Sequence, residues 1–135
     1  MPEDIRVGSL ALRFLCSKHD TGGALDMFEM TCPPNARMPV PHYHRDWDET
    51  IYGLSGVLTL TVDGELVEIA PGDTVHIRRG VVHGLDNRGA CVLTPGVLGP
   101  EYFREIGAEL AANTPDRAKL RTIMERHGLI PAVHA

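Results

Sequence analysis

The stretch that decides the fold spans residues 57–69 and reads VLTLTVDGELVEI. Apolar and polar residues alternate on both sides of Asp63-Gly64, which is the period of a β-strand with one buried face. Asp-Gly is a preferred pair for a two-residue type I′ turn, because both turn positions require a positive φ angle. The stretch therefore predicts an antiparallel hairpin with strands at residues 57–62 and 65–69.

Further short segments with strand character lie on both sides of this hairpin. They are residues 5–15, 25–32, 50–54, 74–77, 85–87 and 90–93. Turn-forming pairs such as Gly22-Gly23 and Arg79-Gly80 separate several of them. Many short strands at even spacing are typical of a β-sandwich or a β-barrel.

The pattern becomes helical after residue 99. Apolar residues recur at helical spacing in residues 101–112 and again between Leu120 and His127, which predicts two helices. We expect the second helix to begin at Thr114 as N-cap and to end before Gly128. The predicted fold is mainly β, with a barrel at residues 1–98 and a helical extension of the same domain at residues 99–135.

Composition and charge restrict the function classes. The chain has 135 residues, enough for one domain with a core, and a formal net charge of −5 without a basic cluster. Nucleic acid is therefore not an expected partner, because binding to phosphates requires a basic face. No apolar run approaches the roughly 20 residues that span a membrane, and the acidic N-terminus lacks the features of a secretory signal. These observations predict a cytoplasmic protein.

Histidines flank the hairpin on both sides. His42 and His44 precede it, Glu49 follows them, and His83 comes after it. In an extended chain alternate side chains share a face, so the first two imidazoles should project to the same side. Imidazole nitrogen and carboxylate oxygen suit iron, nickel, manganese, zinc or copper. These residues predict a site for one divalent transition metal per chain, whose identity stays open.

The spacing of these residues reads His42-x-His44-x4-Glu49-x6-Gly56, then Gly72-x7-Gly80-x2-His83-x3-Asn87. Both motifs resemble those of the cupin superfamily, in the same order and with a hairpin between them. The resemblance covers roughly residues 25–98. It implies an antiparallel jelly-roll β-barrel with a metal inside, bound by His42, His44, Glu49 and His83. Arg78 departs from the pattern, because the second motif usually has proline there; the change alters a turn and removes no ligand.

The resemblance and the ligand set together suggest a metal-dependent enzyme that acts on a small molecule. The first interpretation is a dioxygenase-like oxidoreductase acting on a chelating organic substrate. A non-oxidative isomerase or decarboxylase, and a ligand-binding cupin without turnover, remain open. Glu49 is a candidate proton shuttle, and His76 a candidate base if it faces the interior; a surface or satisfied core position is the other interpretation of His76.

The sequence also raises two questions of packing, one about Trp47 and one about exposed strand edges. Trp47, the only tryptophan, falls between His44 and Glu49 and either covers the mouth of the site or packs in the core. Exposed strand edges and apolar helix faces require cover, so we expect a homodimer.

Overall fold

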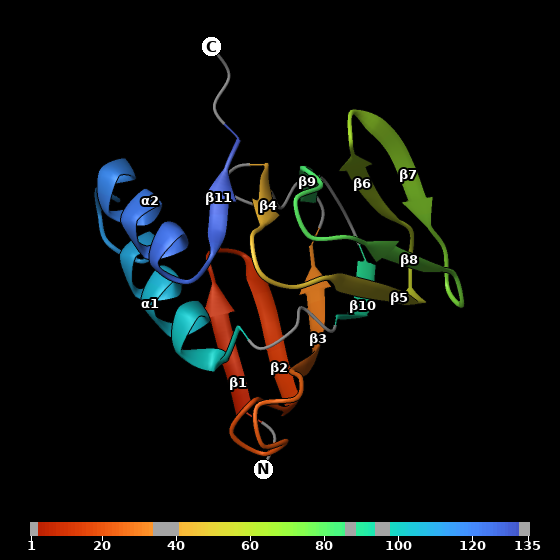
Figure 1. Ribbon diagram of the computed structural model, residues 1–135, viewed down its shortest axis with the longest axis horizontal. Helices are drawn as coiled ribbons and strands as arrows, with labels where there is room; N and C mark the ends of the chain where they lie inside the picture. Colours follow the sequence, from red (N-terminus) through yellow and green to blue (C-terminus); the bar gives the residue numbers. More distant parts are fainter. Residues whose placement is uncertain (1–2, 34–40, 86–88, 94–97, 133–135) are drawn as a thin grey trace.

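The computed structural model describes residues 3–33, 41–85, 89–93 and 98–132, and for residues 89–93 only the backbone. The strands are β1 Glu3–Val7, β2 Leu10–Cys16, β3 Met27–Cys32, β4 His42–His44, β5 Glu49–Ser55, β6 Leu58–Val62, β7 Glu65–Ile69, β8 Thr74–Ile77, β9 His83–Leu85, β10 Gly89–Leu93 and β11 Leu129–Pro131. The helices are α1 Pro100–Leu110 and α2 Arg117–Arg126. The chain is thus mainly β with two helices near its C-terminal end, as predicted (Figure 1).

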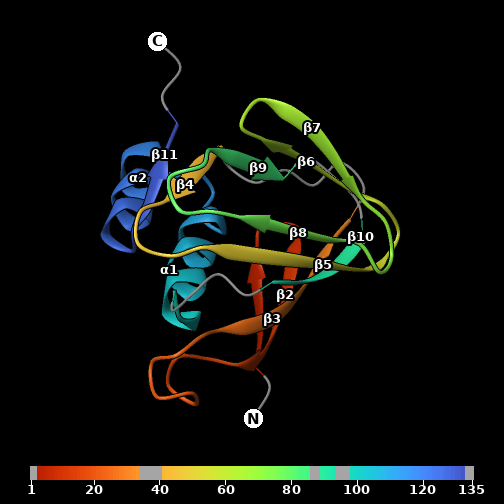
Figure 2. The same ribbon diagram turned by 45° about the vertical axis from the view of Figure 1, so that its right-hand side comes forward.

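The strands form two antiparallel sheets. One has six strands in the order β1-β2-β3-β10-β5-β8, and the other has five in the order β11-β4-β9-β6-β7. Figure 2 shows β8 beside β5 in the first sheet and β9 between β4 and β6 in the second. Both sheets are open in the described parts of the chain, because no strand of one pairs with a strand of the other. The expected closed barrel is therefore not confirmed.

The predicted hairpin is confirmed as β6 and β7. Leu58 lies opposite Ile69, and Val62 lies opposite Glu65. Asp63 has a φ angle of 50° and Gly64 one of 80°, as a type I′ turn requires. Leu58, Leu60 and Ile69 are buried, so one face of the hairpin contributes to the core.

Other segments differ in detail from the prediction. Residues 5–15 are not one strand: Gly8, with a φ angle of 59°, ends β1 and lets the chain return as β2. The N-cap of α2 is Asp116 rather than Thr114, because the Asp116 carboxylate accepts hydrogen bonds from the Ala118 and Lys119 amides. Of the strand expected at residues 85–87, only Leu85 lies within the described residues; Asn87 lies outside them.

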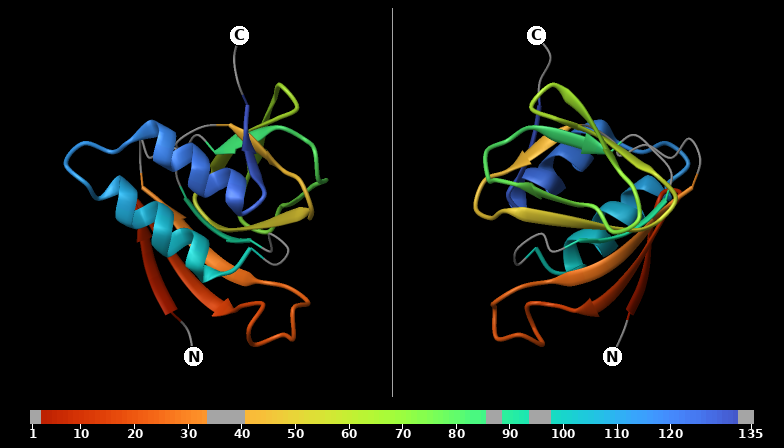
Figure 3. Two further views of the ribbon diagram at one scale, coloured as in Figure 1. Left: turned by 60° about the vertical axis from the view of Figure 1, so that its left-hand side comes forward. Right: turned by 90° about the vertical axis from the view of Figure 1, so that its right-hand side faces the viewer.

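Both helices lie on the same side of the molecule, next to β1 and β11 (Figure 3). Phe103 of α1 packs at steep angles against Phe14 and Phe28, with ring centroids 5.8 and 5.1 Å away. Gly107 lets α1 approach β1 closely, since an added Cβ would lie 2.3 Å from the Arg6 carbonyl oxygen. None of the described helices is long and apolar enough to cross a membrane.

Strand β11 was not predicted from the sequence. This short strand follows the turn at Gly128, whose φ angle is 84°, and pairs antiparallel with β4. Leu129 lies opposite His44, and Pro131 lies opposite His42. The described part of the C-terminal extension, residues 99–132, therefore adds a strand to the sheet as well as two helices, and that strand covers the edge of β4.

Candidate metal centre

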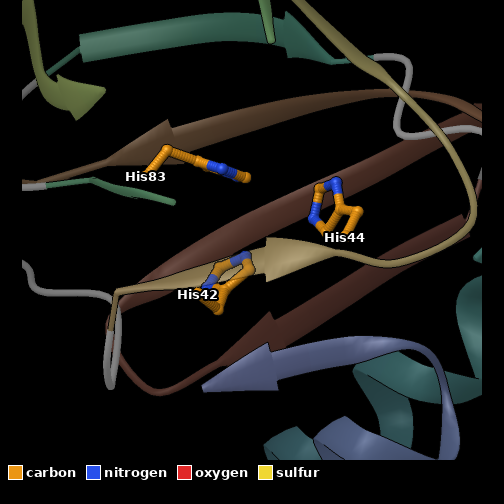
Figure 4. A group of neighbouring side chains, drawn as sticks. All are labelled: His42, His44 and His83. Carbon is orange, nitrogen blue, oxygen red and sulfur yellow. The ribbon is translucent and has the colours of Figure 1, made fainter. Parts of the chain in front are cut away.

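Three histidines from two adjacent strands converge between the sheets. His42 and His44 are the ends of β4, with Tyr43 between them on the other face. His83 begins β9 and lies directly opposite His42. One ring nitrogen of each histidine lies within 4.8 Å of the others, and all three side chains are buried. Figure 4 shows the three side chains close together, with His42 and His44 on the same strand.

A hydrogen bond of His83 determines which ring nitrogen carries a proton. The Nδ1 atom lies 3.0 Å from the Val81 carbonyl oxygen, which can only accept, so Nδ1 carries the proton. In the neutral ring the lone pair is then on Nε2. That atom is buried and has no hydrogen-bond partner among the described residues. This tautomer is the one that a metal ligand needs, with the other nitrogen held by a carbonyl.

Glu49 adds a negative charge to the cluster. It begins β5 in the other sheet, and its Oε2 atom lies 3.2 Å from Nε2 of His83. This pair is a close charge contact without the alignment of a hydrogen bond. Burial alone would raise the pKa of Glu49, but the surrounding imidazoles, His83 above all, outweigh burial and lower it. The carboxylate is therefore ionised at neutral pH inside the protein.

The pKa of His83, the partner of Glu49 in this contact, shifts in the opposite direction. Burial alone would lower the pKa of His83, but the Glu49 carboxylate outweighs burial and raises it. For His44, burial dominates and lowers the pKa, which keeps that imidazole neutral. A buried carboxylate requires a positive neighbour. A divalent cation would meet this need and would also use the lone pairs of three imidazoles, so the residues fit a metal.

The pocket around these groups is apolar. Besides the four polar side chains it is lined by Phe28, Met30, Ile51, Leu60, Leu85, Leu98, Tyr102, Phe103 and Leu129. Strands of both sheets contribute, and so do α1 and β11 of the C-terminal extension. The contribution of α1 and β11 to the pocket was not predicted from the sequence. The helical spacing placed Phe103 on an apolar face, but nothing local related that face to the histidines.

Trp47 packs against the site rather than standing apart from it. Its ring stacks on His44 at a centroid distance of 5.5 Å and an interplanar angle of 29°. On its other side it meets the turn into β11, where an added Cβ on Gly128 would lie 3.1 Å from the indole. The indole Nε1 is buried without a hydrogen-bond partner in the described part of the chain. Trp47 thus links a candidate ligand to the C-terminal extension.

His76 does not join the cluster, and the interior position considered for it is wrong. In β8 the buried side chain is Ile77, so alternation turns His76 outward, where it is exposed. Its ring nitrogens contact Asp48 at 3.2 Å and Thr50 at 2.8 Å. A base in this position lies on the outer face of β5 and β8, away from the pocket.

Asp48 and the turn before His83 form a separate network. The Asp48 carboxylate accepts hydrogen bonds from the backbone and side chain of Arg79, which lower its pKa to about 2. The Gly80 amide donates to the His44 carbonyl oxygen at 2.8 Å. The turn that contains Arg78 in place of proline is therefore fastened to the first motif by these contacts.

Comparisons with known proteins agree with the motifs. The family model described as "Cupin domain" matches residues 28–95. Quercetin 2,3-dioxygenase of Bacillus subtilis is 33% identical over 100 residues, which are 70% of this chain and 29% of that protein. An uncharacterized protein of Aquifex aeolicus is 33% identical over 63 residues, 47% of this chain and 52% of that protein. The chain thus spans less than a third of the first relative and about half of the second.

Solved structures share the fold. A predicted oxalate decarboxylase of Thermotoga maritima has a TM-score of 0.61 at 23% identity, covering 72% of this chain and 92% of that one. A polyketide cyclase of Streptomyces resistomycificus has a TM-score of 0.57 at 25% identity, covering 69% and 70%. The reactions named for these proteins differ, so the fold leaves the reaction open.

Proposed function

This chain belongs to the cupin family, and from that premise we propose that it is a divalent-metal-dependent enzyme, a dioxygenase-like oxidoreductase that acts on a chelating organic molecule. The observation that carries the proposal is the set of three imidazole nitrogens within 4.8 Å of one another in a buried pocket. The ionised Glu49 carboxylate beside His83 supports the same reading, because it needs a cation nearby.

The proposed ligands are His42, His44, His83 and Glu49. The ion is iron, nickel, manganese, zinc or copper, since mixed nitrogen and oxygen ligands suit all of these. When bound, it would supply Lewis-acid chemistry or the activation of dioxygen. Four protein ligands on an ion that accepts six leave positions for a small molecule with two donor oxygens.

The chain's own residues supply the rest of the site. Apolar side chains line the space around the polar cluster, offer apolar contact to a small substrate and keep bulk water from the proposed ligands. Glu49, ionised inside the pocket, can accept a proton from a substrate hydroxyl group. We assign the role of proton acceptor to Glu49 alone, because His76 lies on the outer face of β8.

Oxidative chemistry is preferred because of one relative. The Bacillus subtilis protein that matches over 100 residues is named a quercetin 2,3-dioxygenase, and quercetin is a phenolic molecule that can chelate a metal. The match covers 29% of that longer protein, so the substrate of this chain is proposed only as a class: an aromatic or enediol-like molecule with adjacent oxygen donors.

We also propose that the protein is a homodimer. Large apolar side chains on β5 and on the β6–β7 hairpin are exposed, among them Tyr52, Leu54 and Leu66, the last at 68%. Exposed apolar groups on sheet faces and turns are typical of contact surfaces. Light scattering at micromolar concentration should give twice the mass of one chain, and a monomer mass would contradict the proposal.

Elemental analysis after anaerobic purification of the untagged protein tests the proposed function. We expect about one iron, nickel, manganese or copper per chain, and oxygen uptake with catechol or a flavonol as probe. Zinc, with no oxygen uptake after reconstitution with iron, nickel, manganese or copper, would replace the oxidative proposal by isomerase or decarboxylase chemistry. No metal, even after reconstitution, would leave a binding protein.

A further inference from the structure

Among the described residues that line the pocket outside the two motifs, Tyr102 carries a polar group on its side chain and the others are apolar. It lies in the first turn of α1, in the C-terminal extension, and is 4% exposed. It lines the same pocket as His42, His44, Glu49 and His83. The helical part of the chain therefore contributes a tyrosine to the wall of the pocket that contains the proposed metal centre.

The hydroxyl group has no hydrogen-bond partner among the residues that the structure describes. A hydroxyl group without a protein partner on the wall of a pocket is available to an acceptor that enters the pocket. Burial raises the pKa of Tyr102, so the group stays protonated and can donate. The other described pocket residues outside the two motifs are apolar, so their side chains offer it no acceptor.

The ring of Tyr102 is held in place from several sides. Phe103 and His127 meet it edge to face, with centroids 5.0 and 5.3 Å away. The helix itself is fastened at its start, where the Gly99 amide donates to the buried Asp26 carboxylate at 2.6 Å. A side chain fixed in this way is suited to orient a bound molecule, because little order must be gained on binding.

We propose that Tyr102 is a substrate-binding residue whose hydroxyl group donates a hydrogen bond to an oxygen atom of the molecule that binds the metal. The inference rests on the proposed function and narrows its substrate class. The molecule would have an apolar body for the pocket walls, two oxygen atoms for the metal, and on one of these or on a third oxygen a lone pair that accepts from Tyr102.

The test compares Tyr102→Phe with the control Tyr52→Phe in cobalt-loaded protein. Each variant loses one hydroxyl group, but Tyr52 lies on β5 with 45% of its surface exposed. The probes are catechol, which has two oxygen atoms, and imidazole, which binds metals through nitrogen and then has no acceptor left for Tyr102. Changes in the visible spectrum of the cobalt centre give the dissociation constant of each probe.

We expect Tyr102→Phe to weaken catechol binding about five- to tenfold, the usual effect of one lost hydrogen bond. Imidazole binding, cobalt content and the behaviour of Tyr52→Phe should stay as in the wild type. Equal weakening for both probes would mean a packing role and overturn the inference, as would catechol binding unchanged within twofold.

Failure of the two proposals can be told apart. A wild-type protein that does not hold cobalt refutes the proposed metal centre, and the inference with it. A wild-type protein that holds one cobalt per chain but does not bind catechol keeps the metal centre and overturns the role of Tyr102.

Discussion

The Nε2 atom of His83 lies 3.2 Å from the Oε2 atom of Glu49, so a strand of the five-stranded sheet meets a strand of the six-stranded sheet through a buried imidazole–carboxylate contact. Both side chains are at most 8% exposed. Such a pair is costly to bury unless further groups satisfy it. A cation shared with His42 and His44 would satisfy both partners at once.

Glu49→Gln should therefore weaken metal binding while the protein stays folded. The amide keeps the size of the carboxylate but removes the charge that balances the ion. We expect the affinity for zinc or nickel to fall at least about tenfold, as measured by competition with a coloured chelator. The control is Asp46→Asn in the same loop, whose side chain is 56% exposed and should leave affinity unchanged. Equal affinities in wild type and Glu49→Gln would exclude Glu49 as a ligand.

Two histidines close in sequence should respond differently to replacement by alanine. His83→Ala removes a buried ligand, and we expect most of the metal to be lost while the far-ultraviolet circular dichroism of the sheets is retained. His76→Ala removes an exposed side chain that contacts Asp48 and Thr50, so metal content should be unchanged. Metal analysis of both purified variants checks this. Loss of metal from His76→Ala alone would reverse our assignment.

Trp47 should report metal binding directly. It is the only tryptophan, and its ring stacks on His44 at 5.5 Å. Copper or nickel at His44 should quench its fluorescence and saturate near one equivalent, since ions with open d shells quench nearby indoles, whereas zinc should change the intensity little. In His44→Ala the saturable quenching should disappear. A titration with no inflection near one equivalent would argue against an ion beside Trp47.

The parts of the fold that the sequence predicted depend on local signals. The β6–β7 hairpin follows from the alternation of apolar and polar residues around Asp63-Gly64. The position of His42 and His44 on one face of a strand follows from strand periodicity. The orientation of His76 was left open in the sequence, and the structure resolves it: Ile77 is the buried residue of that strand and His76 is exposed. By contrast β11 has only three residues and forms because the edge of β4 is available, and Tyr102 reaches the pocket through the docking of α1. Neither the pairing of β11 with β4 nor the position of Tyr102 at the pocket is encoded by a pattern in the neighbouring sequence.

Asp26 should make stability depend on pH in an identifiable direction. Its buried carboxylate accepts from the Lys18 and Gly99 amides, and burial raises its pKa above the ordinary aspartate value of 3.8. A raised pKa means that the folded state holds the proton more tightly. This contribution to stability is complete below pH 3.8 and is lost as the pH rises through the folded-state pKa.

Thermal melts of wild type and Asp26→Asn from pH 3.5 to 8 check this sign. The asparagine cannot accept from both amides, so the variant should be less stable throughout, by about 1–3 kcal/mol. The advantage of the wild type should be larger at low pH than at pH 8. An advantage that instead grows with pH would mean that the two backbone hydrogen bonds, and not burial, dominate the titration of this group.

Gly128→Ala, a change in the C-terminal extension, should alter metal binding through Trp47. Gly128 has a φ angle of 84°, and an added Cβ would lie 3.1 Å from the Trp47 ring, which stacks on His44. The control is Gly64→Ala, where the φ angle is 80° but no atom lies within 4 Å of the added Cβ. Both variants should lose about 1 kcal/mol or more from backbone strain. Only Gly128→Ala should also displace the indole, which we expect to shift the tryptophan emission and to weaken nickel binding several-fold. If Gly64→Ala and Gly128→Ala weaken nickel binding equally, strain alone accounts for the effect, and Trp47 does not transmit the position of the C-terminal strand to His44.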